Sequence, residues 1–250
     1  LPPLNEQDWN LAFIKYQQFD QFKLVNTSMT TAEFKWIFFW EWFHRLWARL
    51  IALAAIIPLI YFIIKKIVFK EDIIKILIAI LLGAVAGAVG WIMVQSGLKE
   101  NTVLVNPVNL MSHILVATII VGYVLRVGIE YLYPKQESAY DKKNRIWFAV
   151  LIVLVFIQIG LGALVAGSKA ALVCTTFPLM NGHYYPSEIN FSIADNYEFS
   201  VKLLIQFLHR NLAYFIFFFV LFLFFKTRKV AAQYQFHRSR WLLLGMVLLQ

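Results

Sequence analysis

The fold is decided by the stretch FKWIFFWEWFHRLWARLIALAAIIPLIYFII, residues 34–64. It is long enough to cross a bilayer, because a transmembrane helix needs about 20 predominantly apolar residues. Within it lie Glu41, His44, Arg45 and Arg49. Ionisable side chains inside an apolar span are costly and usually functional. The stretch therefore predicts a membrane helix that carries part of a functional site.

Apolar runs of similar length recur along the rest of the chain. They cover residues 73–95, 108–132, 146–166 and 201–225, and a shorter run covers 241–250. Of the 250 residues, 60% are hydrophobic and 15% are charged, whereas a soluble domain has about 25% charged residues. This composition excludes a soluble domain and a disordered chain. It predicts an all-α polytopic membrane protein.

The formal net charge of +9 has an uneven distribution. Lys and Arg concentrate in the connections after the first, third and fifth runs, as in residues 65–75, 135–145 and 226–240. Basic loops mark the cytoplasmic or matrix face of a membrane protein. We interpret these residues as topology markers only, and the pattern gives no nucleic-acid footprint.

Three features concern the ends of the chain and its single cysteine. The chain starts without Met and stops ten residues into the last apolar run, so we expect an N-terminal crossing and the rest of a C-terminal crossing to be missing. Residues 1–33 are expected to lie on the outer side, with aromatic anchors such as Trp9, Phe13 and Tyr16. Cys174 is the only cysteine, and we expect it to be a small buried or interfacial residue and not a reactive thiol.

The ionisable residues of the first run share one helix face. Glu41, His44 and Arg45 stand at i, i+3 and i+4, and residues at these spacings are neighbours on a helix surface. Arg49 continues that face by one turn.

The same spacing recurs in the fifth run as Gln206, His209 and Arg210, and a third membrane histidine is His113. All three histidines fall in the half of the membrane away from the basic loops. Shared depth is what two facing ligands of one flat cofactor require. A single membrane histidine can instead form a helix-to-helix hydrogen bond. The remaining histidines, His183 and His237, are expected to be solvated loop residues.

Small residues recur in residues 83–98 and 158–168. Such residues allow helices to approach closely, and they also leave room for a planar ring. Together with the repeated motif, they indicate two related halves. Sites of membrane proteins often lie between such repeats.

Several segments carry a resemblance to a known family. In chain order they are PPLNEQDW (2–9), YQQF (16–19), EFK (33–35), EWFHR (41–45), AR (48–49), GWIMVQSGL (90–98), His113, VAG (165–167), FPLM (177–180) and QFLHR (206–210). In these segments the chain resembles the heme A synthases, cytochrome oxidase assembly proteins of bacterial and mitochondrial inner membranes. The likeness is to the mitochondrial and proteobacterial-like branch.

The resemblance implies eight crossings in two tandem pseudo-symmetric four-helix bundles, of which about five and a half are present. It implies an outer segment at 1–33, an N-terminal bundle half at 34–132, an inner basic loop at 133–145 and a truncated C-terminal half at 146–250. His44 and His113 map onto the axial ligands of the substrate heme O. His209 maps onto one ligand of a heme b cofactor, whose second ligand lies outside this chain.

The implied reaction oxidises the C8 methyl group of heme O to a formyl group by successive hydroxylation. The essential glutamate maps onto Glu41, and Arg45, Arg49 and Arg210 are candidate partners of the heme propionates. Glu41 acts either as a proton shuttle or by stabilising a cationic intermediate. The implied partners are heme O synthase and an electron donor such as a ferredoxin, and a homo-oligomer is compatible with the family.

Two other functions remain open at this point. A diheme b-type cytochrome that exchanges electrons with quinone also needs bundle histidines at matched depth. It has no need for a carboxylate one turn from a ligand, and it places its hemes toward opposite membrane faces. A transporter with intramembrane charges would not explain why the His-Arg pair occurs in both halves. The single cysteine also departs from branches in which paired cysteines are proposed to act.

Overall fold

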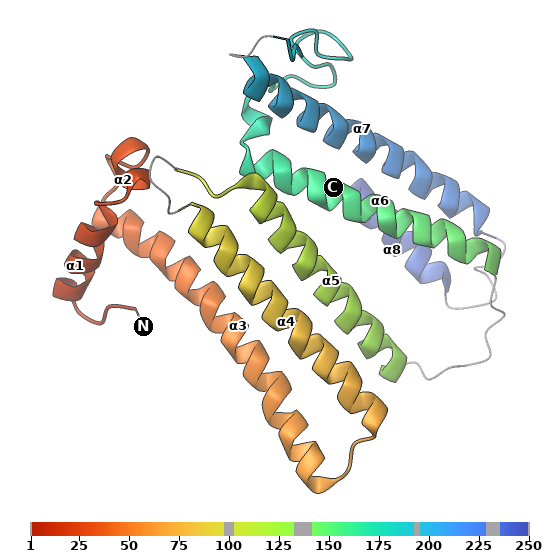
Figure 1. The fold of residues 1–250 in the computed structure, drawn as a ribbon. Coiled ribbons are helices and arrows are strands. Elements are labelled where there is room, and N and C mark those ends of the chain that lie inside the picture. Colours follow the sequence, from red (N-terminus) through yellow and green to blue (C-terminus); the bar gives the residue numbers. More distant parts are fainter. Residues whose placement is uncertain (1, 98–102, 133–141, 193–195, 229–235, 250) are drawn as a thin grey trace. The chain divides into compact units, whose positions relative to one another are not determined.

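The computed structural model describes residues 2–97, 103–132, 142–192, 196–228 and 236–249, and the side chains of residues 142, 143, 236 and 237 are outside this description. The chain divides into two compact units, Leu1–Leu132 and Tyr133–Gln250. The described residues contain helices, connecting loops and one isolated β-bridge. Figure 1 shows the helices of both units.

Five helices are long and apolar enough to cross a membrane. They are α3 (Thr31–Lys65), α4 (Lys70–Ser96), α5 (Pro107–Leu132), α6 (Lys142–Gly167) and α7 (Tyr197–Lys226). Each contains one of the five long runs and extends it by up to four residues at either end. The prediction of an all-α polytopic membrane protein is confirmed. The last apolar run belongs to the shorter α8 (Phe236–Leu248).

Unit 1 begins with two short helices, α1 (Glu6–Tyr16) and α2 (Asp20–Leu24). The side chain of Asn5 accepts a hydrogen bond from the backbone N–H of Asp8 and caps α1. The predicted anchors Trp9, Phe13 and Tyr16 pack around Phe34 at the start of α3, with ring centroids 5.1–6.4 Å apart. The aromatic residues of the outer segment therefore form a small packed cluster against α3.

The long helices of unit 1 have clear end signals. Thr30 and Glu33 form a capping box at the start of α3, in which side chains bond orphan backbone N–H groups. Lys66 ends α3 in a left-handed conformation, with φ of 54°. In the second turn of α4, Lys75 forms an ion pair of 2.8 Å with Glu130 near the end of α5. This pair ties the two helices together.

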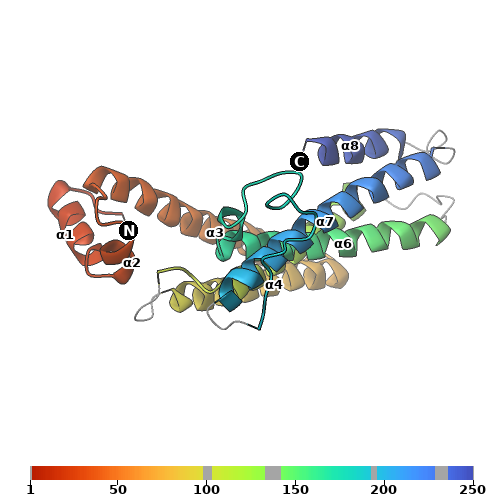
Figure 2. The same cartoon turned by 90° about the horizontal axis from the view of Figure 1, so that it is seen from above.

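Unit 2 consists of α6, α7 and α8 with a connection that begins in a 3-10 turn, η1 (Ala170–Leu172). Figure 2 shows α8 alongside α7. The core shared by α6, α7 and α8 contains Leu151, Ile216, Val220, Leu223 and Leu244. A second core forms where the connection packs on the start of α7, through Cys174, Met180 and Leu203. The expectation that Cys174 is buried is confirmed, since 2% of it is exposed.

Two further details concern the start of α6 and the end of α7. Most of the basic loop at 133–145 lies outside the described residues, and α6 already begins at Lys142. The Phe-rich end of α7 is exposed at Phe218 and Phe225, but Val220 and Leu223 are buried in the core. The helical period explains this, because one face of a helix can be covered while the other is open.

Candidate functional site

The ionisable face of α3 forms as its spacing predicts. The Arg45 guanidinium donates to the Glu41 carboxylate, which stands four residues earlier. These side chains are 55% and 59% exposed, and His44 is exposed beside them. The carboxylate of Glu41 is more than half exposed in the described structure, and the prediction that it acts in a heme site stays a prediction. The cause of the exposure is that α4 and α5 pack mainly on each other, so the described part of unit 1 leaves this face of α3 open.

His113 on α5 faces a glycine on α4. A Cβ atom placed on Gly90 would lie 2.8 Å from the imidazole Cε1 and 3.1 Å from Nδ1. Real Cβ atoms essentially never come within 3.0 Å of another heavy atom, so only glycine leaves room for this ring. The Nδ1 atom is buried and has no hydrogen-bond partner among the described residues.

His209 on α7 has a matching environment in unit 2. A Cβ atom on Gly162 of α6 would lie 3.1 Å from its Cε1. Its Nδ1 is also buried and has no hydrogen-bond partner in the described part of the chain. One turn before the glycine, Gln158 donates through Nε2 to the backbone carbonyl of His209 at 3.1 Å. Each unit therefore seats one imidazole against a glycine of the preceding helix.

The other members of the second motif are held by the connection between α6 and α7. Gln206 is buried and donates through Nε2 to the Cys174 carbonyl at 2.7 Å. Arg210 donates to the carbonyls of Thr176 at 2.7 Å and Cys174 at 3.1 Å. The guanidinium of Arg210 thus orders the connection, and its predicted role toward heme propionates stays a prediction.

The two seated imidazoles fit a metal-binding role. Neutral imidazole is the usual axial ligand of heme iron, and a buried ring nitrogen without a protein partner satisfies one requirement of a ligand. Neither His44 nor His113 lines the cavity beside the start of α3 or the cavity at the end of α7. The prediction that both imidazoles face one shared cavity stays a prediction.

Of the two histidines expected to be solvated, the structure describes the side chain of His183. His183 is exposed, and its backbone forms a bridge with Met180. The side chain of His237 lies outside the described residues, as does Leu98 at the end of the 90–98 motif. No second ligand for His209 is identified among the described side chains. Sequence reasoning noted the glycines as spacers for a planar ring but did not identify the histidine rings that occupy the spaces.

The whole chain matches one family model. The description of that model is cytochrome oxidase assembly protein, and it covers residues 1–250. The curated relatives include heme A synthases from three bacteria. The protein from Azorhizobium caulinodans is 37% identical over 220 residues, which are 87% of this chain and 62% of the relative. The one from Bartonella quintana is 36% identical over 225 residues, covering 87% and 61%.

The third, from Parvibaculum lavamentivorans, is 36% identical over 234 residues, covering 93% of this chain and 67% of the relative. The chain spans about 61% of the length of the first relatives it matches. No solved structure matches the sequence. With a family model that covers every residue, the chain belongs to the cytochrome oxidase assembly protein family.

Proposed function

We propose that the full-length protein is a heme A synthase, which oxidises the C8 methyl group of heme O to a formyl group. Heme A made in this way would serve the assembly of cytochrome oxidase. Family membership and relatives that bear the name heme A synthase support the proposal. The observation that carries it is the Glu41 carboxylate, which lies one turn before His44 and is paired with Arg45. A protein that only carries electrons has no need for a carboxylate at this position.

The proposed substrate site lies in unit 1. His44 and His113 would bind the iron of heme O from opposite faces. Gly90 leaves the space in which the His113 ring stands. The ring orientation is therefore set by packing before any substrate arrives. A ligand held in place in advance loses less conformational freedom on binding.

Glu41 is the group proposed to act on the reacting methyl carbon. Oxidation of the methyl group to a formyl group takes electrons and protons from that carbon. The electrons would pass to an oxidant from outside this chain, and a carboxylate nearby would accept and carry protons. The carboxylate is held beside the Arg45 guanidinium. The same negative charge would stabilise a cationic intermediate, so the geometry supports both roles that the sequence left open.

Unit 2 is the proposed seat of the resident heme b, with His209 as one ligand. A bound heme b would supply one-electron chemistry. The chain's own contribution is to seat the imidazole against Gly162, while Gln158 donates a hydrogen bond to the backbone carbonyl of His209. Arg45, Arg49 and Arg210 remain candidate partners of propionates in the two sites.

The proposed setting is a bacterial inner membrane or the mitochondrial inner membrane, with the basic loops on the cytoplasmic or matrix side. A heme O synthase would supply the substrate, and an electron donor such as a ferredoxin would supply electrons. Assembly into a homo-oligomer is compatible with this setting.

The test is the heme content of the full-length protein co-expressed with a heme O synthase. Chromatography of the extracted hemes separates heme A, its hydroxylated precursor and heme b. We expect heme A or the precursor together with heme b. Recovery of heme b alone, with heme O unchanged in the membranes, would contradict the proposal and favour the b-type cytochrome.

A further inference from the structure

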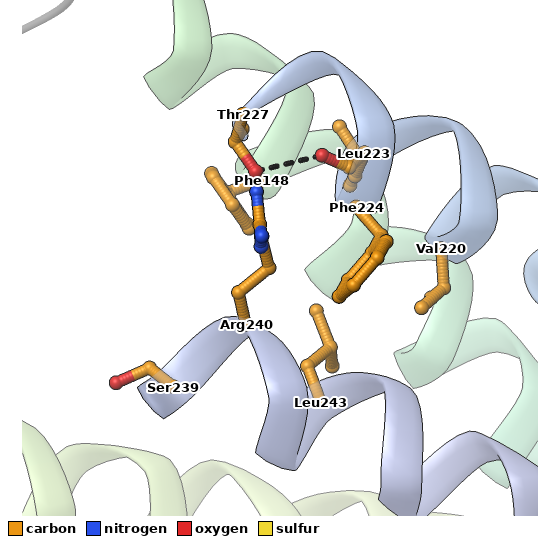
Figure 3. A pocket seen from close by; sticks show the side chains of 8 residues that line it. All are labelled: Phe148, Val220, Leu223, Phe224, Thr227, Ser239, Arg240 and Leu243. Atoms are coloured by element: carbon orange, nitrogen blue, oxygen red, sulfur yellow. Dashed lines mark hydrogen bonds between the residues drawn. The ribbon is translucent and has the colours of Figure 1, made fainter. Parts of the chain in front are cut away.

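A small cavity lies at the end of α7 where α8 packs against it. Its volume is about 180 Å³. The lining is mostly hydrocarbon and comes from α6, α7 and α8: Phe148, Val220, Leu223, Phe224, Thr227, Ser239, Arg240 and Leu243. Figure 3 shows the Arg240 side chain extending from α8 toward Thr227, with Phe224 and Leu243 beside it.

Arg240 is buried and carries hydrogen-bond donors that the described residues do not use. Only 8% of it is exposed, and its buried Nε and Nη1 atoms have no partner in the described part of the chain. The guanidinium carbon lies 4.4 Å from the centroid of the Phe224 ring. This cation–π contact favours the charge. It leaves the N–H groups unsatisfied, because they point outward in the guanidinium plane.

The described neighbours offer no counter-ion to this charge. The acidic residues described in unit 2 are Glu188, in the connection before α7, and Glu198, in its first turn. The cavity borders Thr227, at the opposite end of that helix. The Thr227 hydroxyl donates its proton to the Leu223 carbonyl at 2.7 Å. A buried arginine in this state calls for an anion other than the described residues.

The basic residues of 226–240 are interpreted as topology markers, and for Arg240 the structure adds a second property, burial. A marker of topology lies in water or at the headgroups, whereas Arg240 is enclosed by apolar side chains. The cavity is also distant from the proposed heme seat. Thr227 and His209 are separated by 18 positions of one helix, which is about 27 Å at 1.5 Å per residue.

We propose that this cavity binds an anionic phospholipid, with the phosphate diester on Arg240 and hydrocarbon against the apolar lining. A guanidinium presents N–H donors in a fork that matches phosphate oxygens. Basic pockets between membrane helices are suited to phospholipid headgroups, and neighbouring Lys226, Arg228 and Arg238 add attraction to an anionic surface. A free phosphate ion would need several donors around it, whereas this lining is largely hydrocarbon.

The test measures lipid binding to the full-length protein in detergent by native mass spectrometry at physiological salt. The probes are phosphatidylglycerol, phosphatidylcholine and inorganic phosphate. Arg240→Met removes the guanidinium and keeps an apolar side chain, while Arg238→Gln removes an exposed charge from the same helix. We expect the affinity for phosphatidylglycerol to fall about thirtyfold in Arg240→Met. In Arg238→Gln it should fall no more than about fivefold.

A further variant, Leu243→Trp, fills the apolar part of the cavity and leaves Arg240 in place. It should also lose phosphatidylglycerol, and it decides the question if Arg240→Met does not fold. Equal loss in Arg240→Met and Arg238→Gln would overturn the proposal, as would wild-type binding by Leu243→Trp. If phosphatidylcholine binds as tightly as phosphatidylglycerol, the negative charge of the lipid is not recognised and the proposal fails. Displacement of the lipid by inorganic phosphate would show a free-anion site instead.

Discussion

Helices α3 and α7 carry the same spacing of polar residues but differ in how these residues are used. On α3, Glu41 and Arg45 bond each other and stay more than half exposed. On α7, the corresponding Gln206 and Arg210 bond carbonyls of another segment, and Gln206 is 4% exposed. The spacing fixes which residues share a helix face. The segments that pack on the face decide whether they are buried.

The histidines extend this comparison. His209 and His113 are both seated on a glycine of the preceding helix in the chain, Gly162 and Gly90. His44 has no such seat among the described residues and is exposed. Seating therefore follows from a tightly packed helix pair, α6 with α7 or α4 with α5, rather than from the His-Arg motif.

The largest expected effect comes from removing the seated imidazoles in the full-length protein. If each unit holds its own heme, His209→Ala should lose heme b and keep the substrate heme, and His113→Ala should do the reverse. The loss should be near complete, because an axial ligand is removed. Chromatography of the extracted hemes measures it. Loss of both hemes from either variant would show that the units do not act separately.

The glycine seats predict a smaller effect. Gly90→Ala would bring a Cβ within 2.8 Å of the His113 ring and should destabilise the protein by about 1–3 kcal/mol, the usual range for overpacking. Gly162→Ala, at 3.1 Å, should cost less. Thermal denaturation in detergent checks the order. Gly83→Ala on α4 is the control, because nothing lies within 4 Å of its added Cβ. Equal melting temperatures for Gly90→Ala and Gly83→Ala would refute the seat.

The contrast between Gln206 and Glu41 can be measured as stability. Gln206→Ala removes a buried hydrogen bond to the Cys174 carbonyl, which is worth about 1 kcal/mol. Glu41→Ala removes an exposed i,i+4 pair, and such pairs contribute up to about 0.5 kcal/mol. The melting temperature should therefore fall more in Gln206→Ala. A larger fall in Glu41→Ala would mean that the α3 face is covered in the full-length protein.

The smallest effect concerns the connection that covers α7. Asn181 donates to the Glu188 carboxylate at 2.8 Å, and this hydrogen bond lowers the pKa of Glu188 below its ordinary value of 4.5. A lowered pKa stabilises the folded connection above pH 4.5, and that contribution disappears as the pH falls through the lowered value. The hydrogen-exchange protection factors of residues 174–190 should therefore fall in acid. The variant Glu188→Gln should lose this pH dependence, and retention of it would assign the effect elsewhere.

Hydropathy predicted the crossings because each span is long, apolar and separated from the next by charged residues. The ends were less precise, since they depend on local signals such as the Thr30–Glu33 capping box. Helix α1 was interpreted only as an anchoring segment. Its order comes from aromatic contacts with Phe34, in the next long helix.

The candidate site divides in the same way. The face shared by Glu41 and Arg45 follows from helical spacing alone, so the sequence could predict it. The seat of His113 could not be predicted, because Gly90 stands on a different helix and the contact depends on how α4 meets α5. Burial of Arg240 is likewise a result of packing between α7 and α8.

The central claim is that unit 1 carries the heme that is oxidised and that Glu41 acts on it. The most direct test is the heme composition of full-length Glu41→Gln, which keeps the size and hydrogen bonding of the side chain but removes its ionisable proton. The account predicts that the variant retains both hemes while heme A collapses and heme O or its hydroxylated product accumulates. A wild-type yield of heme A would contradict the claim, and loss of the hemes altogether would make Glu41 a structural residue.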